Sequence, residues 1–263
     1  MLVIGEKINT TLKEAKDIVS RKDEAALQNL AKKQIDAGAN MVDVNVGTRI
    51  NTEVEDMRWA IKTIQQVLDI PCCIDSPNAK ALEAGLQAHK GKALVNSTTL
   101  EKERLKEFLS IVKNYDCKIV ALTMDDEGIP EDDEKRYKIS ANLIEKFTRE
   151  GFALDDIYID PLVRPIATDA HLGIVVLQAM HKISTSFPGV HIICGLSNIS
   201  FGLPKRNLLN RVFLAMAIAK GLDAALVDPL DKDLMATIIS VMALLGKDEF
   251  CANYISSFRE GKI

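Results

Sequence analysis

The chain has 263 residues and a formal net charge of −4, with 47% hydrophobic and 5% aromatic residues. This length suits one barrel-sized domain with a large core and leaves no room for a second large domain. The mild negative charge and the low aromatic content argue against a nucleic-acid-binding protein, which needs a basic surface or stacking side chains.

No segment of the sequence is expected to enter a membrane. The longest apolar stretch near the C-terminus, 238–246, is interrupted by Ser240 and is too short to span a bilayer. The N-terminus reaches Glu6 and Lys7 at once, without the apolar region of a signal peptide. The five cysteines form no C-x-x-C pair, so we expect reduced thiols. These features predict a soluble cytoplasmic protein.

Eight short apolar, β-rich runs recur along the chain, and each is followed by a helix-like segment. The runs span residues 2–8, 41–47, 72–75, 93–97, 119–124, 157–161, 191–197 and 224–228. The helix-like segments span 23–37, 52–69, 77–89, 100–114, 132–150, 170–186, 204–220 and 231–246. Continuous apolar runs are typical of parallel strands that are buried on both faces. Eight such units predict a single (β/α)8 TIM barrel domain over residues 1–263.

Several residues at the predicted helix ends support these boundaries. Asp23 and Asp132 stand where helix N-caps are expected. Pro204 suits the first turn of the seventh helix. Glycines that can end helices precede the next strand at Gly38, Gly151 and Gly221. Residues 9–22, by contrast, are expected to form a long loop after the first strand.

Polar residues end the strand runs, and in a barrel the C-terminal strand ends meet at one pocket. They are Asn9, Asp43 with Asn45, Asp75, Asn96, Thr123, Asp160, Ser197 with Asn198, and Asp228. The set has no histidine, lysine or Ser/His/Asp arrangement, which argues against Schiff-base and acyl-transfer chemistry. Carboxylates and amides suit a hydrogen-bonding heterocycle such as a pterin. The same acids could instead hold a divalent cation, cap helices or begin turns.

The segment Gly195-Leu-Ser-Asn-Ile-Ser200 follows the seventh strand. Its glycine permits close approach of the backbone to a ligand. Loops at this place in a barrel often bind phosphate. However, the segment has one glycine, and the end of the eighth strand, Val-Asp-Pro-Leu, has none. Phosphate is therefore the less favoured ligand.

Six segments, in this order along the chain, resemble those of the pterin-binding methyltransferases. They are Ile4-Gly-Glu-Lys-Ile-Asn9, Asp43-Val-Asn-Val-Gly47, Ile74-Asp-Ser76, Asn96-Ser-Thr98, Tyr158-Ile-Asp-Pro-Leu162 and Gly195-Leu-Ser-Asn-Ile-Ser200. The resemblance is closest to methyltetrahydrofolate:corrinoid/iron–sulfur protein methyltransferases and to related enzymes of corrinoid-dependent demethylation. It covers nearly the whole chain and implies a pterin-binding barrel of the dihydropteroate synthase type.

The resemblance also implies an activity and partners. The enzyme would move a methyl group between N5 of tetrahydrofolate and the cobalt of a corrinoid (cobalamin), in a direction that the sequence does not choose. The segment Asp169-Ala-His171-Leu-Gly173 has its glycine one position too early for a cobalamin-binding motif. The corrinoid is therefore expected on a separate corrinoid protein. A homodimer and the absence of a tightly bound metal are further expectations.

Specific site residues follow from the resemblance. Asn198 would be the catalytic residue, acting on N5 of the folate. The residues expected to bind the substrate are Asp43, Asp75, Asn96, Asp160, Gly195 and Ser197.

Other functions remain open at this stage. A dihydropteroate synthase would share the barrel and part of the pterin site, but it usually carries an Arg-Pro-Gly signature. Here Arg164-Pro165 is followed by Ile166. A folate-binding barrel without catalysis and a metal-dependent barrel enzyme are the remaining alternatives.

Overall fold

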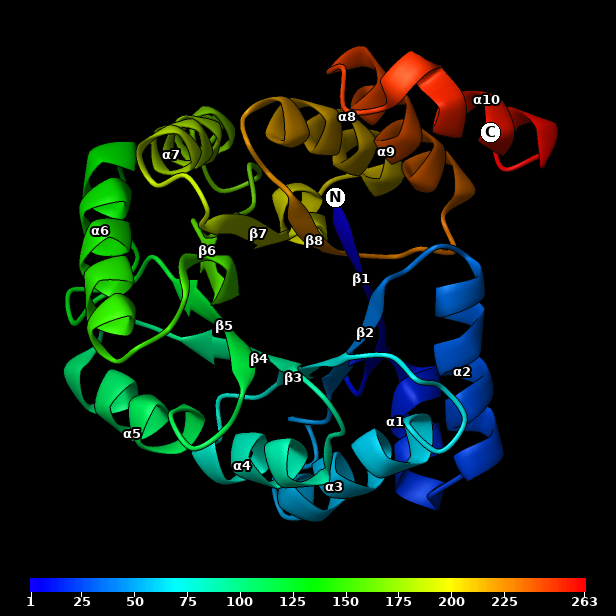
Figure 1. Cartoon of the computed structure of the whole chain (residues 1–263), viewed down its shortest axis with the longest axis vertical. Coiled ribbons are helices and arrows are strands. Elements are labelled where there is room, and N and C mark those ends of the chain that lie inside the picture. The colour runs from blue at the N-terminus through cyan, green and yellow to red at the C-terminus, as the bar shows by residue number, and fades with distance from the viewer.

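The computed structural model describes all 263 residues, and its centre is a closed barrel of eight parallel strands (Figure 1). The strands neighbour one another in chain order, from β1 to β8, and β8 pairs with β1. Their bounds are β1 Leu2–Asn9, β2 Met41–Asn45, β3 Cys72–Asp75, β4 Ala93–Thr98, β5 Cys117–Leu122, β6 Ile157–Asp160, β7 His191–Gly195 and β8 Ala224–Val227. The predicted TIM barrel is confirmed.

Helices surround the barrel (Figure 1), and eight of them correspond to the predicted segments. They are α2 Glu24–Asp36, α3 Glu53–Ile64, α4 Ala79–Ala88, α5 Lys102–Val112, α6 Asp133–Arg149, α7 Leu172–Ser186, α8 Arg206–Ala219 and α9 Lys232–Leu244. Asp23 and Asp132 cap α2 and α6 as predicted, by accepting backbone N–H groups at 3.0 and 2.7 Å. No helix combines the length and the apolar composition needed to cross a bilayer.

Two predictions about the helices were wrong, and one helix was not predicted. Pro204 does not open α8, because Lys205 adopts a left-handed conformation with φ of 50° and the helix begins after it. Residues 9–22 are not a loop throughout, since they contain α1 (Lys13–Arg21). A further helix, α10 (Ala252–Arg259), follows α9. Both missed helices are short, with 9 residues in α1 and 8 in α10. The sequence analysis missed the helical spacing of Ala15, Ile18 and Val19, which α1 buries, whereas α10 buries only Ser257 and offers no such signal.

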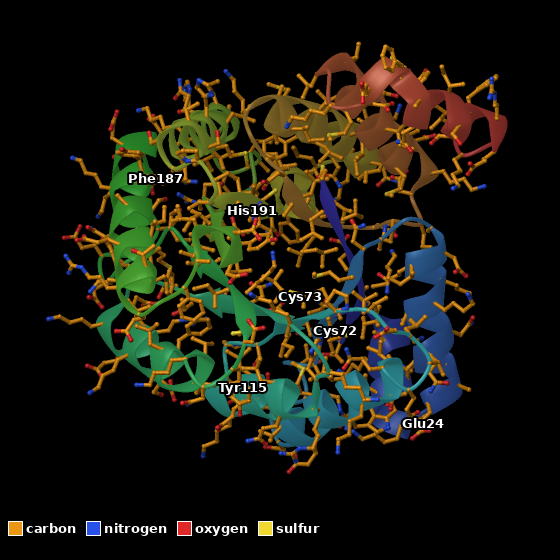
Figure 2. All side chains as sticks on the ribbon, viewed as in Figure 1. Glu24, Cys72, Cys73, Tyr115, Phe187 and His191 are labelled. Carbon is orange, nitrogen blue, oxygen red and sulfur yellow. The ribbon has the colours of Figure 1, made fainter.

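Alternation along the strands divides the core into an inner and an outer part. Cys73 belongs to a small cluster inside the barrel, whereas its neighbour Cys72 belongs to the large core between strands and helices. Figure 2 shows the two side chains on opposite sides of β3. The inner cluster is a single apolar layer: Ile4, Met41, Cys73, Leu94, Val120, Tyr158, Ile193 and Ala224. The side chains of this layer therefore fill the inside of the barrel, and no ligand can pass this level.

The next inward-facing position on each strand lies two residues further on, at the C-terminal mouth of the barrel. Counting from the apolar layer gives a second layer that is mostly polar: Glu6, Asp43, Asp75, Asn96, Leu122, Asp160, Gly195 and Leu226. Five of the seven predicted site residues belong to it. Strand pleating alone thus places them on one floor, above an apolar plug.

Candidate functional site

The predicted polar strand ends of the first four strands lie at one level. Asn9 pairs with Asn45 across β1 and β2, Asn45 with Asp75, and Asp75 with Asn96. The Asn45 amide Nδ2 donates to Asp75 Oδ2 at 2.8 Å. Asn9 instead accepts the backbone N–H and the hydroxyl of Thr11, so it shapes its own loop. The structure brings Asp75 and Asn96 together as predicted.

Asp43 stands two residues before Asn45 on β2, pairs in register with Cys73 and is only 1% exposed. Burial, and then the nearby Asp75 carboxylate, raise the pKa of Asp43 well above its ordinary value. Both causes favour the protonated form of the Asp43 carboxyl group, and that form can donate a hydrogen bond. Its Oδ1 atom, like the Oγ1 atom of buried Thr123, has no hydrogen-bond partner within the protein. Buried polar atoms are normally paired, so a polar ligand on the floor gains from reaching Asp43 Oδ1.

Two further carboxyl groups ionise close to neutral pH. Burial raises the pKa of Asp75 to about 6, against the opposing hydrogen bond from Asn45. Burial likewise raises the pKa of Asp160 to about 7, although the Leu162 N–H donates to its Oδ1 at 2.7 Å. These groups accept hydrogen bonds when ionised and donate when protonated, which matches the mixed edge of a pterin ring.

Arg136 fixes the position of Asp160, and the sequence analysis did not identify it. This α6 side chain is fully buried and donates to the carbonyls of Pro130, Pro161 and Leu162, the last at 2.8 Å. It therefore holds the turn after β6, in which Leu162 has a positive φ of 62°. A signal was present: Arg136 lies in the buried stripe of α6, where a charged residue needs a specific partner.

The turn after β7 carries Asn198, and we call residues Leu196–Ser200 the Asn198 turn. Asn198 is exposed at the mouth. Its Nδ2 atom lies 3.2 Å from the point that a Cβ atom on Gly195 would occupy. Ser197 Oγ donates to Glu6 Oε1 of β1 at 3.3 Å. Gly195, Ser197 and Asn198 therefore lie together at the mouth, as predicted.

Replacing Gly195 by alanine is expected to slow turnover without unfolding the protein. Gly195 has φ of −77° and ψ of 95°, which alanine also adopts, so the melting temperature should stay within about 2 °C. The new methyl group would crowd Asn198 Nδ2 and move this exposed amide. Steady-state kinetics and thermal unfolding of Gly195→Ala and Gly173→Ala test this. Equal turnover in Gly195→Ala and the wild type would show that the glycine does not matter for the reaction.

Asp228 has a structural role at the mouth. Its Oδ1 accepts the Leu230 N–H at 3.0 Å, which begins a turn, and its Oδ2 pairs with Lys7 Nζ at 2.5 Å. The reading of Asp-Pro as a turn start is therefore confirmed. Glu6, which the sequence analysis did not select, occupies the floor beside this pair. Burial raises the pKa of Glu6 as well.

Residues 5–228 match a family described as pterin binding enzymes. The match runs from β1 to the end of β8 and includes the whole layer of polar residues at the mouth. This chain belongs to the pterin binding enzyme family. The resemblance seen in the sequence is thereby confirmed at the level of the family, while the roles of individual site residues remain predictions.

Relatives of this pterin-binding chain include a methylcorrinoid:tetrahydrofolate methyltransferase of Eubacterium limosum. The two are 36% identical over 265 residues, which cover 100% of this chain and 98% of that protein. A methionine synthase of Mycobacterium tuberculosis is 32% identical over 240 residues, or 86% of this chain. The matching part is only 20% of that methionine synthase, so this chain corresponds to a fifth of it.

Solved structures of dihydropteroate synthases share the fold. The enzyme from Burkholderia cenocepacia has a TM-score of 0.70 and 18% identity, covering 94% of this chain and 93% of that one. The enzyme from Yersinia pestis has a TM-score of 0.68 and 14% identity, with 94% of each chain covered. At such low identity the similarity shows a common barrel and does not extend to the reaction.

This pterin-binding barrel has a cavity away from the predicted site and no cluster of metal-binding side chains. A cavity of about 730 Å3 lies on the outside of the barrel, where Val3, Gly38, Met235, Ile238 and Met242 contribute to its lining. None of the predicted site residues lines it. No group of three or more histidine, cysteine or acidic side chains is arranged to share a metal ion.

Proposed function

We propose that this chain transfers a methyl group from a methylated corrinoid protein to N5 of tetrahydrofolate. The observation that carries the proposal is the 36% identity to a methylcorrinoid:tetrahydrofolate methyltransferase, which extends over 98% of that relative. The direction follows the name of that relative, and the same groups would catalyse the reverse transfer. A cytoplasmic location is part of the proposal and agrees with the four buried free cysteines, which persist in a reducing compartment.

The pterin ring binds on the polar floor of the mouth in this proposal. Asp160 and Asp75 accept hydrogen bonds from ring N–H and amino groups, and the Asn96 amide reads an edge with both a donor and an acceptor. Asp43 supports the ring from below. Asp43 Oδ1, one of three buried side-chain atoms without a hydrogen-bond partner, suits a ligand that has donors and acceptors of its own.

Asn198 acts at N5 through electrostatics. The corrinoid on the partner protein supplies or accepts the methyl group. In the proposed direction the N5 lone pair attacks the methyl carbon, the electron pair of the broken bond stays with the corrinoid, and the N5 proton leaves to solvent. A hydrogen bond between the Asn198 amide and N5 or its proton stabilises the transition state when it is stronger there than in the bound substrate. The amide cannot release a proton at neutral pH, so Asn198 positions and polarises N5 and does not act as a general acid. Its exposed place at the mouth leaves N5 accessible to a docked partner.

The corrinoid protein docks over the mouth in this proposal. Large apolar side chains are exposed on five of the eight loops that follow the strands, after β1, β2, β5, β7 and β8. They are Leu12, Ile50, Ile129, Phe201 and Leu230, with Ile50 81% exposed. A discontinuous apolar rim around a polar floor suits a protein partner that presents the face of a corrinoid ring.

A homodimer is also proposed, with α8 at its interface. Leu208, Val212 and Met216 follow one another at four-residue spacing and are each about half exposed. This apolar stripe on an outer helix is the kind of surface that a second copy buries. The sequence analysis had not located an interface.

Val212→Glu is expected to convert a dimer into a monomer, because it places a charge in the middle of the stripe. Sedimentation of this variant beside Lys220→Glu, an exposed residue at the end of the same helix, tests the interface. A wild type that sediments as a monomer would contradict the homodimer. A dimeric Val212→Glu would place the interface elsewhere.

A paired activity assay tests the proposed function. The protein is incubated anaerobically with tetrahydrofolate and methylcobalamin as the methyl donor, and 5-methyltetrahydrofolate is measured; the reverse assay uses 5-methyltetrahydrofolate and cob(I)alamin. We expect methyl transfer in both. In parallel, a pterin diphosphate and p-aminobenzoate should give no dihydropteroate. Dihydropteroate formation without methyl transfer would overturn the proposal.

A further inference from the structure

The first strand contains a β-bulge at the mouth of the barrel. Gly5 pairs with Val42 and Ile8 with Val44, so β1 uses three steps where β2 uses two. One residue of β1 is therefore extra. Such a bulge changes the direction of side chains locally and is common beside active sites.

Two residues, Gly5 and Gln34, specify this bulge. The extra backbone N–H, that of Lys7, donates to the side-chain Oε1 of Gln34 at 2.9 Å. Gln34 belongs to α2 and is fully buried. A Cβ atom on Gly5 would lie only 2.4 Å from Gln34 Oε1, so only glycine leaves room for this side chain. Gly5 and Gln34 together therefore specify the bulge.

The bulge directs two consecutive side chains towards the mouth. In a regular strand Glu6 and Lys7 would face opposite sides of the barrel wall. Here Glu6 Oε1 accepts the hydroxyl of Ser197, and Lys7 Nζ pairs with Asp228. The partners come from the loops after β7 and β8. The first strand therefore contacts the last two loops of the mouth through adjacent residues.

The Asn198 turn is also held from its outer side. Arg206, the first residue of α8, donates to the Ser197 carbonyl at 2.6 Å and to Ser200 Oγ at 3.1 Å. Ser200 Oγ in turn donates to Asn210 Oδ1 at 2.7 Å. These contacts restrain the backbone of the turn. The Ser197 hydroxyl donates instead to Glu6, and this bond restrains the turn from inside the barrel.

We propose that Glu6 is a positioning residue for methyl transfer: from the bulge it holds Ser197, and through Ser197 it fixes the turn that carries Asn198. The inference rests on the proposed function for its effect on turnover, because Asn198 is the group whose placement matters there. The mechanical part, that Glu6 restrains the turn, depends only on the geometry.

Four variants test this inference. Glu6→Ala should lower kcat about tenfold, the size of effect expected for one lost hydrogen bond, with the Kd for tetrahydrofolate within about twofold. Glu6→Gln keeps a side-chain oxygen that accepts the Ser197 hydroxyl, so it should recover most of the turnover. Ser197→Ala should match Glu6→Ala, and the double variant should be no slower than either, because both remove one contact.

Amide hydrogen exchange provides a readout that needs no activity. Exchange across residues 196–201 should be faster in Glu6→Ala than in the wild type and unchanged in Glu127→Gln, a control at an exposed mouth carboxylate. Unchanged exchange in Glu6→Ala, additive losses in the double variant, or Glu6→Gln as slow as Glu6→Ala would each overturn the role of Glu6. A wild type without any methyl transfer would overturn the proposed function instead, and the exchange result would still decide whether Glu6 restrains the turn.

Discussion

Asp160→Asn is expected to weaken tetrahydrofolate binding by about 10- to 100-fold, the range for loss of one or two hydrogen bonds to a charged group. Asparagine keeps an oxygen for the Leu162 N–H but presents an NH2 group where the pterin needs an acceptor. Isothermal titration of the variant beside Asp36→Asn, a surface carboxylate at the end of α2, measures the effect. Unchanged affinity in Asp160→Asn would remove this residue from the site.

The same substitution is expected to stabilise the free protein near neutral pH. The pKa of Asp160 is about 7 in the fold, against an ordinary value of 3.8. Between these values the folded protein keeps a proton that the unfolded chain releases, so this group lowers stability as the pH rises from about 4 to about 7. Asparagine does not titrate. The melting temperature of Asp160→Asn should therefore exceed that of the wild type at about pH 8 and approach it at about pH 4.

Binding should have the opposite pH dependence. If the pterin is held by ionised Asp160, the ligand must displace its proton at low pH. The affinity of the wild type should then fall by up to about tenfold for each pH unit below 7, and Asp160→Asn should lose this dependence. An affinity of the wild type that rises towards low pH would mean that protonated Asp160 holds the ligand.

Asn198→Ala is expected to lower kcat by about 100-fold or more, which is typical for removal of one donor that acts on a transition state. The Kd for tetrahydrofolate should change by less than about threefold, because the contact is proposed to tighten only during transfer. Turnover and calorimetric affinity are measured for this variant and for Asn207→Ala, an exposed asparagine nearby. Equal losses in kcat and in affinity would show that Asn198 contributes ordinary binding.

The strand ends were readable from the sequence because two regularities coincide. Parallel strands in a barrel expose their C-terminal ends at one face, and alternation sets every second residue inward. Asp75, Asn96 and Asp160 each stand two residues beyond a member of the apolar layer, so their convergence follows from counting. Asp23 and Asp132 were readable for a similar reason, since an N-cap is a local signal.

Glu6 and Arg136 could not be recognised in the same way. The direction of Glu6 depends on a bulge that Gln34 stabilises from 27 residues away along the chain. Arg136 acts on the carbonyls of a loop that follows β6, about 25 residues later. Such contacts are long-range, and no local periodicity reports them. The exposed apolar stripe on α8, which is proposed as a dimer interface, could not be recognised either, because an apolar residue on a helix is expected in the core until the exposed face is known.

The most direct test of the account is an isothermal titration of the wild type and of Asp75→Ala with tetrahydrofolate under anaerobic conditions. We expect binding in the micromolar range by the wild type, within the usual span for enzyme substrates, and its loss in the variant. That result would establish the polar mouth of the barrel as the folate site. Absence of binding by the wild type, or equal affinity in both proteins, would contradict it.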